Sequence, residues 1–352
     1  MESATQFEGP EKRLKIMLSS LQPGLRSNIG GRWNRVVNTS NASVISKIST
    51  EYADAYLLSE SSLFVWEDGI LMITCGQTIL INALPEILNI VDKNNIAFVF
   101  YERKNFMFPH EQPSDFEDDA ARMLELFPGK SYRLGPANYD HLHIFCWAKA
   151  GAVPEPDAIL RVLMNNLDPS VMEIFYEKNA GTPALAGERS GLCDICSRLP
   201  GIGNEKKTEM IMDDYLFSPY GYSLNGIFGT NYCTVHVTPQ PGSSYASFET
   251  NIIKEDYSGV IKEIISVFQP GKFSIALTTS VEDHFLSLHP TVARALPDYS
   301  VTEKSLYELD CGYAVTFLNY KISAVESEKQ KVQGRTGFAT PSEMLANQSC
   351  QR

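Results

Sequence analysis

The sequence predicts an α+β sandwich built mainly from antiparallel strands. Segments with the period-two pattern of strands outnumber helical segments, and strictly alternating strand–helix units are absent. A doubly wound parallel sheet would need those alternating units, so that architecture is not favoured. A similar order of elements also occurs twice along the chain, which indicates two halves of related design.

The first half opens on a strand with two different faces. Leu14 and Ile16 share an apolar face. The alternation places Glu11, Arg13 and Lys15 together on the opposite, charged face. The elements expected next are strands over 56–65, 70–75 and 96–101 and a helix over about 78–92.

The second half repeats this order at later positions. Residues 179–207 are rich in Gly, Ser and charge and are expected to form a long loop. One sandwich domain is expected over residues 1–324, and the tail over 325–352 has too little apolar sequence to order itself. The other expected elements are strands over 141–148, 158–164, 232–238, 244–249, 273–277 and 313–320 and a helix over 255–268.

The composition favours a small-molecule or protein partner. The 352 residues carry 30 Lys and Arg against 42 Asp and Glu, a formal net charge of −12 at pH 7. Without a basic tract, this balance argues against nucleic acid or an anionic membrane as partner. No signal peptide and no apolar run of bilayer length are recognisable, so a cytoplasmic protein with seven thiols is expected.

One alternative interpretation is a metal site. Cys193 and Cys196 have the spacing of half a zinc site, and His141 and His143 would place two imidazoles on one face of a strand. A closed structural zinc site normally has two well-spaced ligand pairs, and no second C-x-x-C is present, so no metal is expected. The sequence also lacks phosphate-binding loops, nucleophile elbows and H-E-x-x-H motifs.

The most unusual segment is 56–65, where polar residues at 59–62 interrupt an apolar strand pattern. Such a break is expected at functional sites, and the alternative is a bulge or edge with solvated hydroxyls. From Phe7 to about Phe317 the chain resembles the eukaryotic S-adenosylmethionine decarboxylases, pyruvoyl enzymes of polyamine synthesis. The motifs that carry the resemblance are Tyr-x-Leu-Ser-Glu-Ser-Ser-x-Phe-Val (56–65), Thr-Cys-Gly (74–76), Arg-Lys-Asn-Phe (103–106), Gly-Tyr-Ser-x-Asn (221–225), His-x-Thr-Pro (236–239) and Ser-Tyr-x-Ser-Phe-Glu (244–249).

The resemblance implies a four-layer αββα sandwich and a chain that cuts itself. In the family, the serine matching Ser61 attacks the carbonyl of the residue matching Glu60, and an ester replaces the peptide bond. β-Elimination then leaves a β chain of residues 1–60 and an α chain of 61–352. The α chain begins with a covalent pyruvoyl group made from Ser61, which is the implied cofactor.

The resemblance also implies roles for other residues. His236 would remove the α-proton of the ester, and Ser223 would assist. The pyruvoyl group would form a Schiff base with the substrate amine, carbon dioxide would leave, and Cys75 would protonate the product. Glu8 and Glu11 are retained near the site. Without the resemblance, His236 would be a core histidine, Ser223 a turn hydroxyl and Cys75 an inert thiol.

The implied substrate is S-adenosylmethionine, and the product would be the aminopropyl donor for spermidine and spermine. Phe7 and Phe217 match two phenylalanines that sandwich the adenine, where aromatic faces also stabilise a nearby sulfonium by about 0.5 to 2 kcal/mol. Leu58 and Glu60 would line the pocket through their backbones. Gln240 stands where the family usually has a glutamate that holds both ribose hydroxyls. The neutral amide would lose about 1 to 2 kcal/mol of charge-assisted bonding.

A second departure concerns putrescine, which activates some family members from a buried acidic cluster between the sheets. In this chain, cations occupy several positions of the cluster, and Ile73 replaces a lysine. Cations fixed in the chain would supply the charge that a diamine otherwise supplies, so putrescine is not expected to be required. The cluster is formed by Arg13, Lys15, Asp157, Arg161 and Glu249.

Two hypotheses remain open at this point. The first is a self-processing decarboxylase, which the resemblance allows to form a homodimer of processed αβ units. The second is a non-catalytic paralogue that binds and regulates an active decarboxylase, and Gln240 and Ile73 give it some support. A dead copy is expected to lose at least one working residue, whereas Ser61, Cys75 and His236 are all present.

Overall fold

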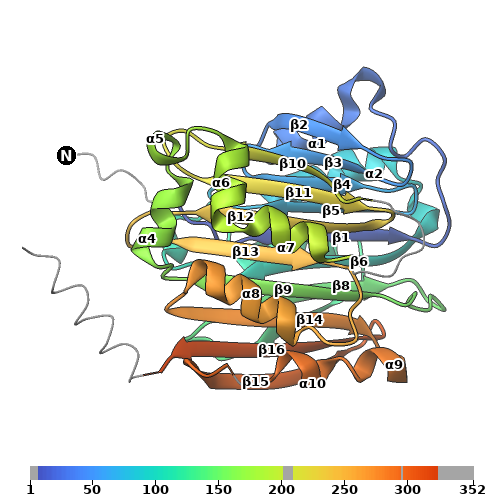
Figure 1. Cartoon of the computed structure of the whole chain (residues 1–352). Coiled ribbons are helices and arrows are strands. Elements are labelled where there is room, and N and C mark those ends of the chain that lie inside the picture. The colour runs from blue at the N-terminus through green and yellow to red at the C-terminus, as the bar shows by residue number, and fades with distance from the viewer. Residues whose placement is uncertain (1–6, 201–208, 295, 324–352) are drawn as a thin grey trace, which may run out of the picture.

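The computed structural model describes residues 7–200, 209–294 and 296–323, and the predicted tail over 325–352 lies outside them. Within the described residues, two eight-stranded sheets stack face to face (Figure 1). Neighbouring strands pair antiparallel in both sheets, and helices cover the outer faces. The predicted four-layer α+β sandwich is confirmed.

The two sheets share one strand order, which confirms the two related halves. Each strand of the first sheet has a counterpart at the same place in the second. In spatial order, the first sheet contains β2 (Val44–Ser49), β3 (Asp54–Leu58), β4 (Ser61–Val65), β5 (Gly69–Thr74), β1 (Lys12–Leu18), β6 (Ile96–Lys104), β8 (Leu142–Ala148) and β7 (Lys130–Leu134). The second contains β10 (Ile211–Leu216), β11 (Tyr222–Phe228), β12 (Asn231–Thr238), β13 (Tyr245–Thr250), β9 (Ala158–Asn165), β14 (Lys272–Ser280), β16 (Tyr313–Ile322) and β15 (Tyr299–Leu309).

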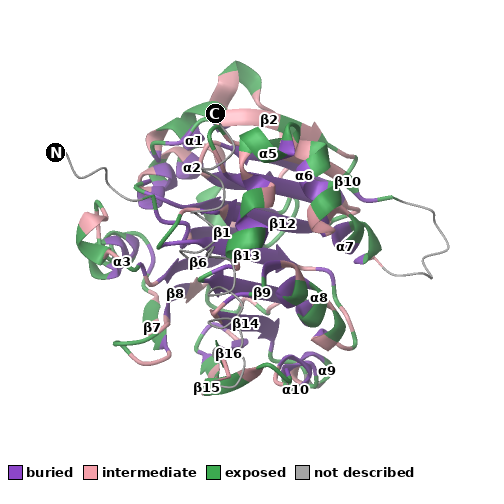
Figure 2. Ribbon diagram, turned by 60° about the vertical axis from the view of Figure 1, so that its left-hand side comes forward, coloured by how far each residue is buried: buried purple, intermediate pink, exposed green. Residues whose placement is uncertain are grey.

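The helices form the two outer layers, and the purple strands in Figure 2 lie beneath their partly green, exposed surfaces. No helix in the described ranges has the length and apolar character needed to span a bilayer. The first sheet is covered by α1 (Arg32–Thr39), α2 (Ala83–Ile90) and α3 (Phe116–Leu124). The second is covered mainly by α4 (Pro169–Met172), α6 (Pro183–Ser190), α7 (Leu192–Arg198), α8 (Ser258–Phe268), α9 (Asp283–Leu286) and α10 (His289–Val292).

The charged face of β1 is buried between the sheets. Leu14 and Ile16 pack in the apolar core under α1 and α2, as the alternation predicts. Arg13, on the other face, is only 5% exposed because the second sheet covers it. A buried guanidinium needs compensating charge, so this layer must contain acids as well as apolar side chains.

Two sequence predictions are wrong. The predicted single strand over 56–65 is a hairpin, because Ser59 and Glu60 turn the chain between β3 and β4. The predicted loop over 179–207 contains the end of α5 (Glu177–Ala180) and all of α6 and α7, while residues 201–208 lie outside the description. The start of α6 carries a recognisable cap, since Thr182 Oγ1 accepts from the Leu185 N–H at 3.3 Å and proline follows it.

Candidate active site

The hairpin between β3 and β4 places Ser61 in an unusual conformation. Ser61 pairs with Leu58 across the turn, and its φ of 111° lies in a region that non-glycine residues rarely adopt. Such a backbone costs on the order of 1–3 kcal/mol. The residue is buried, and its Oγ has no hydrogen-bond partner among the described residues. Ser61 therefore combines a strained backbone with an unengaged hydroxyl.

The turn after β5 lies against the Glu60-Ser61 peptide. The Cys75 N–H donates to the Glu60 carbonyl oxygen at 3.1 Å, which polarises that carbonyl. The Cys75 Sγ lies 3.8 Å from Glu60 Oε2. Burial, followed by the nearby Glu60 carboxylate, raises the pKa of Cys75 well above its ordinary value, and burial raises the pKa of Glu60 to about 7. The thiol stays protonated at neutral pH.

Glu8 and Glu11 border the same turn but have different partners. The Glu8 carboxylate accepts the N–H groups of Met107 and Phe108 at 2.6 and 2.9 Å, so it anchors the loop after β6. Burial still raises the pKa of Glu8 above its ordinary value. Glu11 accepts from Ser247 Oγ at 2.5 Å, and burial raises its pKa to about 8. Glu11 is therefore largely protonated near pH 7.

His236 and Ser223 face each other across β11 and β12. Ser223 Oγ lies 2.9 Å from His236 Nδ1, and the opposite ring nitrogen, Nε2, lies 2.9 Å from Thr234 Oγ1. Burial lowers the pKa of His236 to about 3, so the ring is neutral and able to accept a proton. The structure thus brings the two residues together as the resemblance implies.

Three residues of this site were missed at the sequence level. The Asn225 Oδ1 accepts from Ser62 Oγ at 2.7 Å and from Thr234 Oγ1 at 2.9 Å. Those hydroxyls must then accept from the His236 Nε2–H, which leaves the Nδ1 lone pair for the Ser223 O–H. Asn225 is the last residue of the Gly-Tyr-Ser-x-Asn motif. Its place in that motif was the one feature of the sequence that could have indicated its role.

The predicted substrate-binding residues lie around the same end of the sandwich. Gly76 has a φ of 59°, and a Cβ there would lie 2.6 Å from the Phe7 ring, so only glycine admits Phe7. Ser243 Oγ donates to the Phe7 carbonyl at 3.5 Å. The Ser243 N–H donates to the Gln240 carbonyl at 3.2 Å, which joins Gln240 to this edge.

Phe217 packs beside a glycine turn, and the Leu58 side chain points into the core. The Phe217 N–H donates to the Gly221 carbonyl at 2.8 Å, and the Phe217 ring packs beside that glycine, whose φ is 122°. The side chain of Leu58 is fully buried in the core beneath α1 and α2. Only the backbone of Leu58 is therefore free to line a pocket.

The charged cluster is closely paired, and Glu102 is an additional member of it. Arg161 Nη2 lies 2.5 Å from Glu102 Oε2, whereas Glu249 is paired with Arg13 at 3.0 Å. Glu102 also pairs with Arg13 at 2.7 Å. Burial alone would raise the pKa of Glu102, but the two guanidiniums hold it below its ordinary value. Sequence reasoning missed Glu102 because its partners lie on other strands.

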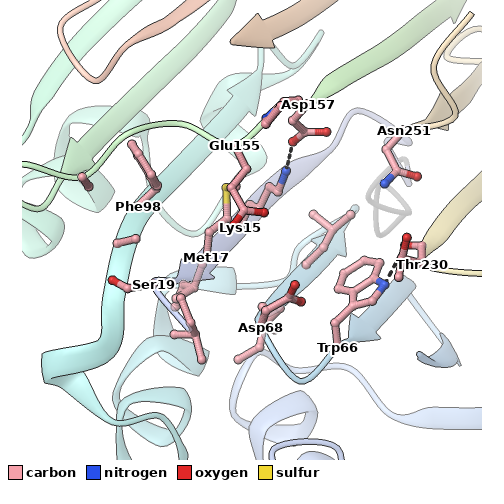
Figure 3. A pocket seen from close by; sticks show the side chains of 18 of the residues that line it. Lys15, Met17, Ser19, Trp66, Asp68, Phe98, Glu155, Asp157, Thr230 and Asn251 are labelled. Atoms are coloured by element: carbon pink, nitrogen blue, oxygen red, sulfur yellow. Dashed lines mark hydrogen bonds and ion pairs between the residues drawn. The ribbon is translucent and has the colours of Figure 1, made fainter. Parts of the chain in front are cut away.

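Lys15 and Asp157 form the most exposed ion pair of the cluster. Lys15 Nζ lies 2.6 Å from Asp157 Oδ2, and Figure 3 shows this pair at the wall of a cavity of about 560 Å³. Asp68 and Trp66 line the same cavity. Because β1 begins beside Cys75 and ends at this cavity, the two sites lie at opposite ends of the strand.

The residues of the metal alternative are not brought together. Cys193 and Cys196 belong to α7, over the outer face of the second sheet. His141 and His143 lie at β8 of the first sheet, with ring centroids 5.0 Å apart. Across the ranges that the structure describes, no group of three or more His, Cys, Asp or Glu residues could hold a metal ion.

Comparisons with known proteins agree with this arrangement. Residues 4–321 match the family model described as adenosylmethionine decarboxylase. The chain is 31% identical to an S-adenosylmethionine decarboxylase proenzyme of Dictyostelium discoideum, with 90% of this chain and 86% of the relative covered. It is 32% identical to the Leishmania donovani proenzyme, with 95% of this chain and 91% of that relative covered.

A solved structure is also similar. A crystal structure of Trypanosoma brucei AdoMetDC-delta26 monomer matches with a TM-score of 0.55 and 26% identity, over 74% of this chain and 99% of that one. The chain belongs to the S-adenosylmethionine decarboxylase family.

Proposed function

We propose that this protein is a self-processing, pyruvoyl-dependent S-adenosylmethionine decarboxylase. The observation that carries the proposal is the geometry at Ser61. A buried serine with an unengaged hydroxyl follows a carbonyl that accepts the Cys75 N–H, and its φ of 111° is relieved when the chain is cut. These residues fit a pyruvoyl group made from Ser61, which would act as an electron sink for loss of carbon dioxide.

In the proposed cleavage, the Ser61 Oγ attacks the Glu60 carbonyl carbon. The developing oxyanion is stabilised by the Cys75 N–H, which already points at that oxygen. His236 then serves as the base through Nδ1, which takes the α-proton of the ester by way of the Ser223 hydroxyl that donates to it. β-Elimination releases Glu60 as a carboxylate and leaves a dehydroalanine at position 61, which water converts to the pyruvoyl group with loss of ammonia. Ser62, which lies 3.2 Å from His236 Nε2, joins the ring to the hairpin that is cut.

In the proposed decarboxylation, the protonated Cys75 thiol supplies the proton that replaces carbon dioxide. Phe7 and Phe217 would hold the adenine, and Gln240 would accept from one ribose hydroxyl. The product would be the aminopropyl donor for spermidine and spermine. Burial keeps the Cys75 proton in place at neutral pH, as a general acid requires.

A single experiment distinguishes this proposal from the regulatory-paralogue hypothesis. A denaturing gel of the purified protein should show two bands, matching chains of residues 1–60 and 61–352. Intact mass of the longer chain should correspond to an amino-terminal pyruvoyl group. One uncut band with no carbon dioxide release would favour the regulatory paralogue instead.

Replacing His236 with alanine should stall maturation at the ester. The variant keeps Ser61 and the Cys75 N–H, so the attack can occur, but the base for β-elimination is gone. We expect cleavage to slow by about 10²–10⁴-fold, the usual contribution of a general base. Hydroxylamine should cut the accumulated ester, as read on a gel, and His289→Ala, at a buried histidine bonded to Thr279 and Thr316, is the control. Normal pyruvoyl formation in the His236 variant would contradict its role.

The charge balance of the cluster supports independence from putrescine. Lys15, Arg13 and Arg161 supply three positive charges. Asp157, Glu102 and Glu249 supply three negative charges, so the cluster is neutral as it stands. A diamine would therefore find no unpaired acid among these six groups, and two further positive charges beside balanced ion pairs are unfavourable.

Putrescine should therefore not stimulate the wild-type protein. Lys15→Ala should lower basal activity because it leaves Asp157 unpaired beside the cavity, and millimolar putrescine should then restore it several-fold. Carbon dioxide release with and without diamine measures both effects. Lys149→Ala is the matched control, since that lysine lines the same cavity but donates to the Asn94 carbonyl. Clear stimulation of the wild type would contradict the internal-cation proposal.

A further inference from the structure

A buried lysine that sequence reasoning did not single out lies directly beneath the Cys75 turn. Lys12 is the first residue of β1, and its exposed fraction is zero. Its Nζ donates to the Gly76 carbonyl at 2.9 Å and to the Thr78 carbonyl at 2.7 Å. A buried amine is costly unless its donors are satisfied, so these two contacts account for its position.

The ring of Phe106 and the guanidinium of Arg103 also lie close to the Lys12 amine. Its Nζ lies 5.0 Å from the centroid of the Phe106 ring, and the Arg103 guanidinium carbon lies 5.3 Å from the same centroid. Burial, followed by the charge of Arg103, lowers the pKa of Lys12 to about 7. Both carbonyls can be held in either protonation state, because even a neutral amine retains two N–H donors.

The turn that Lys12 supports contributes to two separate chemical steps. Its Cys75 N–H donates to the Glu60 carbonyl, and its Cys75 Sγ lies 3.8 Å from the Glu60 carboxylate. Two further bonds fix the turn, from the Gly76 N–H to the Glu8 carbonyl at 2.9 Å and from Thr78 Oγ1 to the Cys75 carbonyl at 2.7 Å. Without Lys12, the carbonyls of Gly76 and Thr78 would lose a buried donor, and the turn would shift to find another.

We propose that Lys12 is a positioning residue that acts through the Cys75 turn in both chain cleavage and product protonation. This inference rests on the proposed function, because it assumes that Glu60-Ser61 is cut and that Cys75 is the proton donor. The two hydrogen bonds of Lys12 Nζ go to the Gly76 and Thr78 carbonyls and not to Glu60 or Ser61, so Lys12 would act through the turn. A displacement of about 1 Å in a reacting group can cost about 10²-fold in rate, so the support matters to both steps.

The test is Lys12→Met, which keeps an unbranched side chain only one atom shorter than lysine and removes the donor. We expect cleavage to slow by about 10–10²-fold, measured as band conversion on a gel. In the cleaved fraction, kcat should fall more than KM changes. Mass spectrometry of the 61–352 chain should show a larger share with amino-terminal alanine in place of pyruvate, the product of misdirected protonation.

Lys104→Met is the matched control. Lys104 is also fully buried on the first sheet, but its Nζ pairs with Asp140 at 2.9 Å and does not contact the turn. It should lower the melting temperature and leave cleavage and the pyruvate share as in the wild type. If Lys12→Met only lowers the melting temperature as Lys104→Met does, the inference is wrong.

A third variant tests the inference if Lys12→Met does not fold. Lys12→Gln keeps two amide N–H donors, so it should cut faster than Lys12→Met. Its side chain is one atom shorter than lysine, so the turn must move to meet it and cleavage should be slower than in the wild type. Wild-type rates in both steps for this variant, when Lys12→Met does not fold, would also overturn the positioning role. An uncut wild-type chain on the same gel would instead be a failure of the proposed function.

Discussion

Replacing Ser61 with alanine should leave the chain as one uncut polypeptide without decarboxylase activity. The variant lacks the hydroxyl that attacks the Glu60 carbonyl, and no other residue can become the pyruvoyl group. Activity should fall by at least about 10⁶-fold, the lower end of enzymatic rate enhancements, because the electron sink itself is missing. Intact mass and carbon dioxide release measure the two effects.

Ser62→Ala is the control for this experiment. Ser62 is the adjacent residue of β4, and its Oγ donates to Asn225 and contacts His236 rather than the cleaved bond. The variant should still be cut, although more slowly, because His236 loses one of its neighbours. If Ser61→Ala is cut at the wild-type rate, Ser61 is not the nucleophile that this geometry indicates. A Ser62→Ala protein that also stays uncut would show that the loss of cleavage is not specific to the Ser61 hydroxyl.

Cys75→Ala should separate the second chemical step from the first. Alanine retains the backbone N–H that donates to the Glu60 carbonyl, so the chain should be cut at close to the wild-type rate. The thiol proton is lost, and decarboxylation should fall by about 10²–10⁴-fold, the range for a missing general acid. Gel conversion and carbon dioxide release on the same sample report both results.

The fate of the cofactor provides a further readout for Cys75. After carbon dioxide leaves, the electron pair must take a proton at one of two carbons. A proton on the former pyruvoyl carbon leaves the substrate nitrogen on the chain as an amino-terminal alanine, and water releases the rest of the substrate as an aldehyde. Mass spectrometry of the 61–352 chain should detect this alanine. Cys146→Ala, which removes a buried thiol from the core between the sheets, should behave as wild type, and full activity with intact pyruvate in Cys75→Ala would contradict the assignment.

Local pattern in the sequence was sufficient for much of the architecture. Alternation along β1, the repeated order of elements and the lack of strand–helix alternation predicted two related antiparallel halves, and both are present. The cap at Thr182 and the proline after it were also readable, but the Gly and Ser content of that segment favoured a loop. The hairpin at Ser59 and Glu60 was missed because no glycine or asparagine marks the turn.

The sequence by itself determined which residue types and motifs are present, and its resemblance to the family is what proposes Ser61, Cys75, Ser223 and His236 for the chemistry. The tertiary structure alone decided which groups meet, because contacts between strands far apart in the chain leave no periodic trace within either strand. The pairing of Arg161 with Glu102 and the support of the Cys75 turn by Lys12 are of this kind. In both cases a polar, ionisable group is buried between or beneath strands, where water cannot satisfy it, so its position depends on the groups that folding brings beside it.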